Sequence, residues 1–322
     1  MTRHAPPTDA PLYEGLADGP PGGRAWWLKT SDGVRIRIAA WVPAGATTTV
    51  VLLPGRTEFV EKYGRAAADL AQRGYATLTV DWRGQGLADR ALVDPMTGHV
   101  LHFDEYQRDL DAVLAAATTL GLPDPAHLLS HSMGGAIALR ALMRGLPFRT
   151  AVFSAPMWGI RIAPALRPVA LALAGASGAT GLAHHYAPGT FPVSYVATAP
   201  FAGNVLTTDP EMFDWMKVQV AAVPAFGLGG PSLGWLHAAL TECRRLAARP
   251  SPRVPALTFL GLTERVVPIP PIHARMRRWP GGRLVEVPGA EHEVIMEGPA
   301  MRAAFFDAAT AFFAANPGEV AS

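Results

Sequence analysis

Short apolar runs rich in β-branched residues recur along the chain and predict the strands of a sheet. Each run is brief and stops at glycine, proline or a polar residue, as buried strands do. The first two runs flank the dipeptide Asp32-Gly33, which predicts a hairpin turn between them. We expect strands at 25–30, 34–43, 47–53, 75–82, 126–130, 150–156, 255–261 and 283–289.

Between these runs, apolar residues recur at helical spacing. The segment 63–74 shows this pattern and ends on Gly74, a natural C-terminal cap. Alternation of strand and helix is typical of a mostly parallel sheet that helices cover on both faces, so we predict an α/β fold. The expected helices lie at 63–74, 103–121, 134–145, 270–279 and 301–316.

The alternation is interrupted between residues 157 and 250. This stretch is rich in Gly, Pro, Ala and Trp and contains no convincing strand. We therefore predict one α/β core, formed by residues 24–156 and 251–322, with a helical cap inserted at 157–250. Residues 1–23 are rich in Pro, Gly and Asp, and we expect them to be a loosely ordered N-terminal segment.

Composition narrows the class of protein. The chain has 322 residues, 49% of them hydrophobic, which is enough for a full core. A net charge of +2 implies no strong steering towards nucleic acid or an anionic membrane. The single cysteine, Cys243, excludes an intramolecular disulfide and a cysteine-rich metal site, and we expect it in a helix, buried or half-buried.

Two segments bear on localisation. Residues 168–183 are uncharged, but they contain three glycines and fall short of the about 20 residues that a spanning helix needs. The N-terminus has no apolar stretch typical of a signal peptide. We expect a cytoplasmic protein, either free or peripheral to the inner face of the membrane.

The stretch LLSHSMGG, residues 128–135, joins a predicted strand to a predicted helix through a tight turn. In this setting a strained turn lifts a serine hydroxyl above the sheet, and small residues are needed around it because backbone segments pass close by. Gly134 and Gly135 supply them on one side and Ser130 on the other. We predict Ser132 as a nucleophile. A plain Ser/Gly turn before a helix is the alternative.

A serine nucleophile needs a base and an acid that orients the base, and in this architecture both follow the serine in the chain. Glu264 is the candidate acid because it is the only carboxylate just after the predicted strand 255–261. His292 is the candidate base because it lies in the loop after the last strand. Glu291 and Glu293 flank it and could compete for its orientation, but we expect both to point elsewhere.

The oxyanion of a tetrahedral intermediate needs hydrogen-bond donors. We expect the backbone N–H groups of Met133, the residue after the serine, and of Arg56, in the loop after strand 47–53. The Arg56 side chain could turn to solvent or pair with Glu58.

The quoted motifs are similar to those of α/β-hydrolases of the monoacylglycerol lipase and bacterial lysophospholipase group. SHSMGG at 130–135 resembles the group's elbow, and the block 54–86, which ends in DWRGQG, resembles its segment from the oxyanion loop onwards. Residues 204–213 and 229–236 resemble parts of the lysophospholipase-type cap. The chain departs from the pattern with Ser130 for glycine, Pro54 for histidine, Ala88 for serine and Glu264 for aspartate.

This resemblance implies a serine hydrolase that cleaves carboxylic esters, a lysophospholipase or monoacylglycerol lipase with no cofactor and no metal. The expected partner is a small ester or monoacyl lipid rather than nucleic acid, with membrane contact through the cap as an option. A small-ester carboxylesterase and a non-catalytic ligand-binding protein of the same fold are the alternatives. The apolar cap residues that we expect as candidates for lining the site are Trp215, Met216, Phe226 and Trp235.

Three weaker signals favour ordinary structural roles. GQGLAD at 84–89 begins like a dinucleotide-binding motif but has Asp89 in place of the third glycine. HEVIME, from residue 292, lacks the second histidine of a zinc-protease motif. The pairs His99/His102 and His184/His185 have no carboxylate or cysteine at ligand spacing, so we interpret them as surface or loop histidines.

Overall fold

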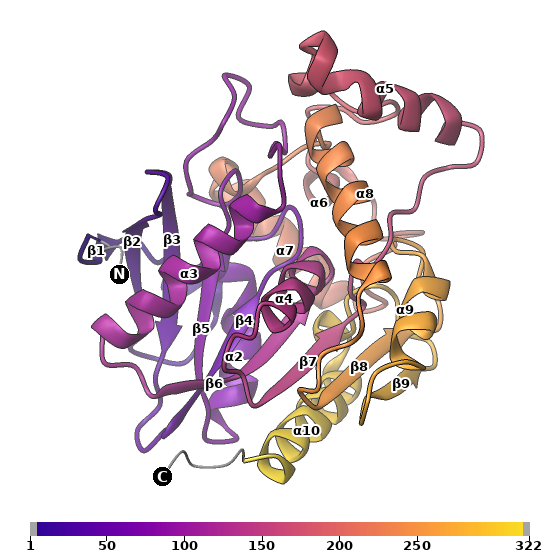
Figure 1. Cartoon of the computed structure of the whole chain (residues 1–322). Coiled ribbons are helices and arrows are strands. Elements are labelled where there is room, and N and C mark those ends of the chain that lie inside the picture. Colours follow the sequence, from indigo (N-terminus) through magenta and orange to yellow (C-terminus); the bar gives the residue numbers. More distant parts are fainter. Residues whose placement is uncertain (1–4, 318–322) are drawn as a thin grey trace.

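A single nine-stranded sheet forms the centre of the molecule, seen in the computed structural model that describes residues 5–317 (Figure 1). The order across the sheet is β1-β2-β3-β5-β4-β6-β7-β8-β9. The strands are β1 Thr8–Ala10, β2 Arg24–Lys29, β3 Arg35–Trp41, β4 Thr48–Leu53, β5 Ala76–Asp81, β6 Asp124–His131, β7 Thr150–Ser154, β8 Ala256–Gly261 and β9 Arg283–Val287.

The sheet has an antiparallel edge and a parallel main part. β1, β2, β3 and β5 pair antiparallel, and β2 and β3 form the hairpin predicted from Asp32-Gly33. From β5 through β4, β6, β7 and β8 to β9 every pairing is parallel. Loops at the carboxyl ends of these parallel strands therefore gather at one edge of the sheet, where open α/β sheets bind ligands.

Helices cover both faces, as the sequence predicted. Side chains of α3, α4 and α9 pack on one face, and those of α2 and α10 on the other. The helices are α1 Glu14–Ala17, α2 Gly64–Ala71, α3 Asp104–Thr119, α4 Met133–Met143, α5 Arg167–Thr180, α6 Tyr195–Thr198, α7 Pro210–Ala222, α8 Leu233–Ala248, α9 Ile269–Met276 and α10 Pro299–Ala315, with 3-10 turns at Val60–Tyr63, Leu182–His184, Pro224–Phe226 and Val294–Met296.

Continuous apolar runs in the strands follow from this double covering. In β4, Val51 and Leu53 belong to the core under α3 and α4, whereas Val50 and Leu52 belong to the core under α2 and α10. All four are fully buried. Alternate side chains of a strand point to opposite faces, so a strand buried on both faces must be apolar throughout.

The N-terminal segment is more ordered than its composition suggested. Residues 8–10 form β1 at the sheet edge, and α1 follows, whereas we expected loosely ordered chain over 1–23. The strand was not recognised because its sequence, Thr-Asp-Ala, is polar, and backbone pairing with residues 25–27 of β2 holds it. The part of the expectation that covers residues 1–4 lies outside the described residues.

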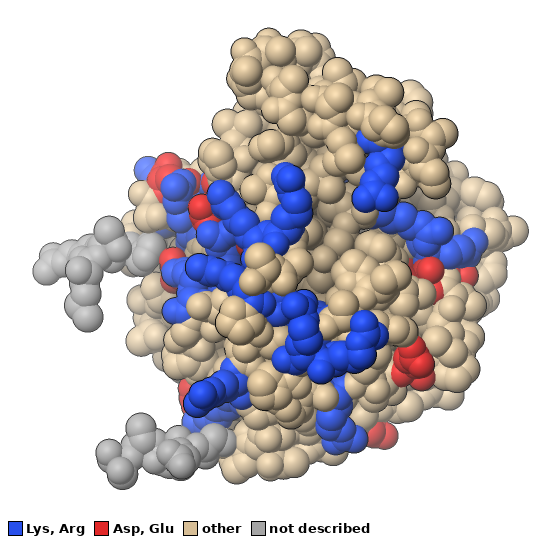
Figure 2. All heavy atoms as spheres, turned by 45° about the vertical axis from the view of Figure 1, so that its right-hand side comes forward, with Lys and Arg blue, Asp and Glu red and all other residues tan. Residues whose placement is uncertain are grey.

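Residues 157–250 contain α5 to α8 and no strand. We call them the α5–α8 segment. Helix α5 packs on α8 through Ala170, Ala174, Leu233 and Leu236 and projects beyond the rest of the molecule (Figure 1). Figure 2 shows this projecting end free of charged side chains, above a face on which Lys and Arg side chains gather. Within residues 5–317, no helix is long and apolar enough to cross a bilayer.

Candidate active site

Ser132 occupies the sharp turn between β6 and α4. Its backbone has φ 48° and ψ −116°, a conformation that non-glycine residues rarely adopt. The turn is fixed by backbone hydrogen bonds, because Ser132 N–H donates to Ser154 and the Ser132 carbonyl accepts from Gly135 and Met157. The strained turn places the hydroxyl at the carboxyl edge of the sheet, as expected for a nucleophile elbow.

The residues around Ser132 are small for different structural reasons. A Cβ on Gly134 would lie 2.1 Å from the Leu53 carbonyl oxygen, and one on Gly135 would lie 2.5 Å from Pro156. Neither position can hold a larger residue without backbone movement. Ser130 lies within β6 and is 1% exposed, with its hydroxyl 3.5 Å from the Val152 carbonyl oxygen. The strand accommodates a hydroxymethyl group there, which explains why glycine is not required.

His292 lies between Ser132 and Glu264. Its Nε2 is 3.0 Å from Ser132 Oγ, and its Nδ1 is 2.6 Å from Glu264 Oε2. Burial disfavours the charged form of Glu264, but the hydrogen bond and charge of His292 oppose it. With two further backbone hydrogen bonds from Val266 and Val267, they lower the pKa of Glu264. The arrangement holds an ionised carboxylate against the imidazole.

The two neighbouring glutamates point away from His292 Nδ1. Glu291 pairs with Arg265, at 2.6 Å from Oε1 to Nη2. Glu293 pairs with Lys62, at 2.7 Å from Oε1 to Nζ. Glu264 is thus the carboxylate that contacts the imidazole nitrogen facing away from the serine.

Two backbone N–H groups lie beside Ser132. Met133 is the first residue of α4, where N–H groups have no partner within the helix. On the other side, the chain leaves β4 and passes so close that a Cβ on Gly55 would lie 3.1 Å from Ser132 Cβ. Arg56 is the next residue. Both N–H groups predicted for the oxyanion therefore belong to backbone that borders the hydroxyl.

The motif DWRGQG, residues 81–86, holds this loop in place through hydrogen bonds. Gln85 donates to the Gly55 carbonyl and accepts from Thr57 N–H. Asp81 accepts hydrogen bonds from Val60 N–H and Leu87 N–H. A Cβ on Gly86 would lie within 2.4 Å of the Asp81 carboxylate, so only glycine fits.

A buried ionic network that sequence reasoning missed lies beneath the site. Lys62 Nζ bonds Glu58 at 2.8 Å and Glu293 at 2.7 Å, and all three side chains are buried. Glu58 also accepts from Tyr63 OH and from Gly55 N–H. Lys62 thereby connects the loop that carries Arg56 to the loop that carries His292.

The charges of this network are set by burial and by one another. Burial works against ionisation of Glu58, but Lys62 and His131 outweigh it and lower its pKa to about 2. Burial raises the pKa of Glu293 and lowers that of His131 to about 3. Glu58, His131 and Glu293 form the one potential metal-ligand group among residues 5–317. The Lys62 ammonium already pairs with both carboxylates, so we interpret the group as an ion-pair network.

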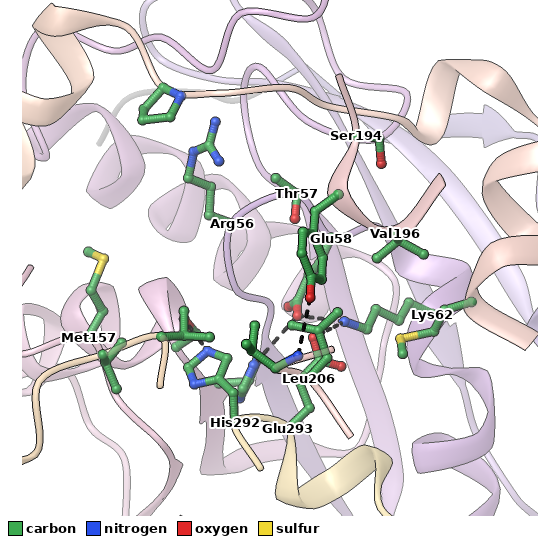
Figure 3. A pocket seen from close by; sticks show the side chains of 18 of the residues that line it. Arg56, Thr57, Glu58, Lys62, Met157, Ser194, Val196, Leu206, His292 and Glu293 are labelled. Atoms are coloured by element: carbon green, nitrogen blue, oxygen red, sulfur yellow. Dashed lines mark hydrogen bonds and ion pairs between the residues drawn. The ribbon is translucent and has the colours of Figure 1, made fainter. Parts of the chain in front are cut away.

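A cavity of about 430 Å³ opens above Ser132 and His292. Figure 3 shows its labelled lining side chains, with Lys62 and Glu293 on one side and Met157 on the other. Of the four candidate lining residues, Met216 and Trp235 border the cavity. Trp215 and Phe226 do not: the indole of Trp215 donates to the Leu16 carbonyl, and Phe226 stacks on Phe59. Composition of the segment could not reveal which helix face points inward.

The remaining polar candidates have structural roles. A ring nitrogen of His99 lies 2.8 Å from Ser232 Oγ, and the rings of His184 and His185 contact each other at a tilt of 35°. Cys243 is a buried free thiol in α8, as expected. Residues 84–89 form turns rather than the start of a helix, so the dinucleotide motif is not present.

Comparisons with known proteins place this geometry in a family. The family described as "Serine aminopeptidase, S33" matches residues 45–299. Lysophospholipase L2 of Escherichia coli is 32% identical over 292 residues, covering 88% of this chain and 85% of that protein. Probable lysophospholipase L2 of Haemophilus influenzae is 29% identical over 251 residues, covering 77% and 78%.

Solved structures share the fold at low sequence identity. A soluble variant of monoglyceride lipase from Saccharomyces cerevisiae has a TM-score of 0.67 at 16% identity, covering 98% of this chain and 97% of that one. A carboxyl esterase from Bacillus coagulans has a TM-score of 0.70 at 14% identity, covering 91% and 98%. These findings confirm the predicted fold, that of α/β-hydrolases, and the predicted resemblance.

Proposed function

The chain belongs to the serine aminopeptidase S33 family of hydrolases, and from this premise we propose that it cleaves carboxylic esters of monoacyl lipids. The observation that carries the proposal is the contact chain from Ser132 Oγ through His292 to the buried Glu264 carboxylate. Lysophospholipid or monoacylglycerol is the proposed substrate class.

The proposed reaction proceeds through an acyl-enzyme. Ser132 Oγ attacks the ester carbon while His292 Nε2 takes the hydroxyl proton, and Glu264 stabilises the resulting imidazolium. The N–H groups of Arg56 and Met133 donate to the oxyanion. His292 then gives the proton to the leaving alkoxide oxygen. A water molecule attacks the acyl carbon by the same route and releases the fatty acid and the free serine.

The lining of the cavity supports a lipid substrate. Val196, Val205, Leu206, Met216 and Val220 border it and come from the α5–α8 segment. Burial of an acyl chain against such side chains contributes about 25 cal/mol per Å². We propose that residues 157–250 act as a cap and that residues 24–156 and 251–322 act as the catalytic core. The names of the curated relatives agree with this substrate class.

The exposed face of α5 supports contact with a membrane surface. Leu166, Val169, Leu171 and Leu173 are each at least 39% exposed. We propose that they touch lipid where the substrate is collected. Sedimentation with vesicles should fall when Val169 and Leu171 are changed to serine. Unchanged sedimentation would remove α5 from this role.

A hydrolysis screen tests the proposed function. It compares p-nitrophenyl esters of graded length, monoacylglycerols, lysophospholipids and amino-acid p-nitroanilides with the wild-type chain. We expect the highest kcat/KM on monoacyl lipids. A preference for acetate esters would indicate a small-ester hydrolase, and a preference for the anilides would indicate a peptidase.

A further inference from the structure

The Arg56 side chain takes neither of the two positions considered from the sequence. It points away from Glu58 in Figure 3 and borders the cavity above Ser132. One terminal nitrogen donates to the Gly229 carbonyl, and the guanidinium lies over the Trp235 ring, 5.3 Å from its centre. A Cβ on Gly98 would collide with it, so glycine leaves the room that the guanidinium occupies.

Arg56 is a half-buried cation that pairs with no carboxylate among residues 5–317. Its Nε is buried and has no hydrogen-bond acceptor in that part of the chain. Burial lowers the pKa of Arg56 to about 10, so the group is still charged near neutral pH. Lys62, on the opposite side of Glu58, has two carboxylates within 2.8 Å. Removing part of a charged group from water is costly unless a partner compensates it, so an anion bound in the cavity would stabilise the Arg56 guanidinium.

The lining of the cavity is chemically mixed. Arg56 and Trp235, which contact each other, border it, and so do apolar residues such as Val196, Leu206 and Val220. In the view of Figure 3, the guanidinium and Val196 lie on different sides of Thr57 and Glu58. Because the Arg56 backbone borders Ser132, an ester held at Ser132 has its acyl and alcohol portions in reach of these different surroundings.

We propose that Arg56 forms a subsite for the phosphodiester of a lysophospholipid headgroup. This inference rests on the proposed function and selects lysophospholipid over monoacylglycerol. The planar guanidinium matches phosphate oxygens with paired N–H donors. The glycerol carbons separate the scissile ester from the phosphate, as the Arg56 side chain separates its backbone N–H from the guanidinium. One residue thus serves the oxyanion through its backbone and the headgroup through its side chain.

The decisive measurement is a ratio of specificities. It compares kcat/KM for a lysophosphatidylcholine and a 1-monoacylglycerol of the same short acyl chain, both below their micelle concentrations. Arg56→Met should lower the ratio of lysophospholipid to monoacylglycerol by about tenfold to about a hundredfold, as for a lost charged hydrogen bond. Arg56→Lys keeps the charge but lacks the paired N–H donors of a guanidinium, so its specificity ratio should lie between those of the wild type and Arg56→Met. Arg253→Met, which removes an arginine outside this cavity, should leave the ratio unchanged.

A second measurement separates the subsite from the reaction. Glycerophosphocholine, a soluble phosphodiester, should bind the wild-type chain in calorimetry and bind Arg56→Met more weakly by a similar factor. If the wild-type chain hydrolyses neither lipid but binds glycerophosphocholine through Arg56, the proposed function fails and the subsite stands. Binding of inorganic phosphate but not of the diester would overturn the headgroup assignment. An unchanged specificity ratio in Arg56→Met would overturn it as well.

Discussion

The two walls of the cavity differ in the interactions that hold them: ion pairs stabilise the wall on the sheet side, and apolar contacts predominate in the wall formed by the α5–α8 segment. The wall on the sheet side is held by buried charges, among them the Lys62 pairs and the pairs of Arg37 with Glu61 and Asp81, whose side chains are fully buried. The α5–α8 segment carries no Asp, Glu, Lys or Arg between residues 168 and 208. Most of the side chains with which it borders the cavity are apolar, with Arg161, Ser194 and Tyr195 as the exceptions, and other apolar side chains of the segment are exposed to solvent.

The difference follows from what each wall has to do. The proposed proton transfer from Ser132 to His292, with Glu264 orienting the imidazole, needs hydrogen bonds of fixed length and direction. Directional ion pairs hold the loops that carry these residues. An acyl chain needs only apolar area, which packs without a preferred direction. We therefore expect substitutions that break these hydrogen bonds and ion pairs to reduce activity on every ester. Substitutions of apolar lining residues in the α5–α8 segment should instead change the choice of acyl chain.

The largest effect is expected at the serine. Ser132→Ala removes the proposed nucleophile, so turnover and labelling by a fluorophosphonate should both disappear. Ser130→Gly should keep most of both, because Ser130 lies within β6 and away from the apex of the turn. If labelling is lost in Ser130→Gly and kept in Ser132→Ala, the nucleophile is Ser130 and the assignment of Ser132 is wrong.

The acid should have the next largest effect. Glu264→Gln keeps a hydrogen-bonding oxygen beside His292 but cannot stabilise the imidazolium, so kcat should fall by a factor of about 10² to 10⁴. The fall should be smaller than in His292→Ala. Glu291→Gln is the matched control, since Glu291 pairs with Arg265 and should leave kcat nearly unchanged. Full activity in Glu264→Gln would assign the role to another carboxylate.

Breaking the ionic network should cost stability as well as rate. Lys62→Met leaves Glu58 and Glu293 without their cation, and removal of one partner of a buried pair costs about 3–5 kcal/mol in free energy of unfolding. The loops that carry Arg56 and His292 lose their link, so kcat should fall too. Denaturant titration and steady-state kinetics measure both effects. Lys29→Met, at an exposed position, is the control.

The difference in stability between Lys62→Met and the wild type should change with pH in a defined direction. In the wild type, the pKa of Glu58 is about 2 in the folded chain against an ordinary value of 4.5. Its contribution to stability is therefore present above pH 4.5 and is lost as pH falls towards 2. Without Lys62, both carboxylates favour protonation, so the stability gap between Lys62→Met and the wild type should narrow from pH 7 to pH 4. A gap that widens would contradict the role of Lys62 as their counter-ion.

The same contrast separates what the sequence could predict from what it could not. Ser132 and His292 follow from a local turn motif and from chain order, and Glu264 from its place after a strand. The role of Lys62 was not predicted because its partner Glu293 lies 231 residues away in the sequence. Its other partner, Glu58, lies four residues from it, a spacing typical of an exposed ion pair on a helix. Trp215 and Trp235 could not be told apart, because the path of the α5–α8 segment decides which aromatic faces the cavity.

The smallest and most selective effect should come from the apolar wall. Met216 lines the cavity from α7, whereas Val218 on the same helix is 56% exposed. Met216→Trp should fill the space of an acyl chain, and each methylene kept from burial costs up to about 0.8 kcal/mol, or about fourfold in kcat/KM. The profile of kcat/KM against chain length should flatten for medium and long esters, with acetate and butyrate esters little affected. Val218→Trp adds the same ring on the outer face and should leave the profile unchanged. If both variants lose activity equally at every length, the α5–α8 segment supports the fold of the site without selecting the chain, and the contrast between the two walls fails.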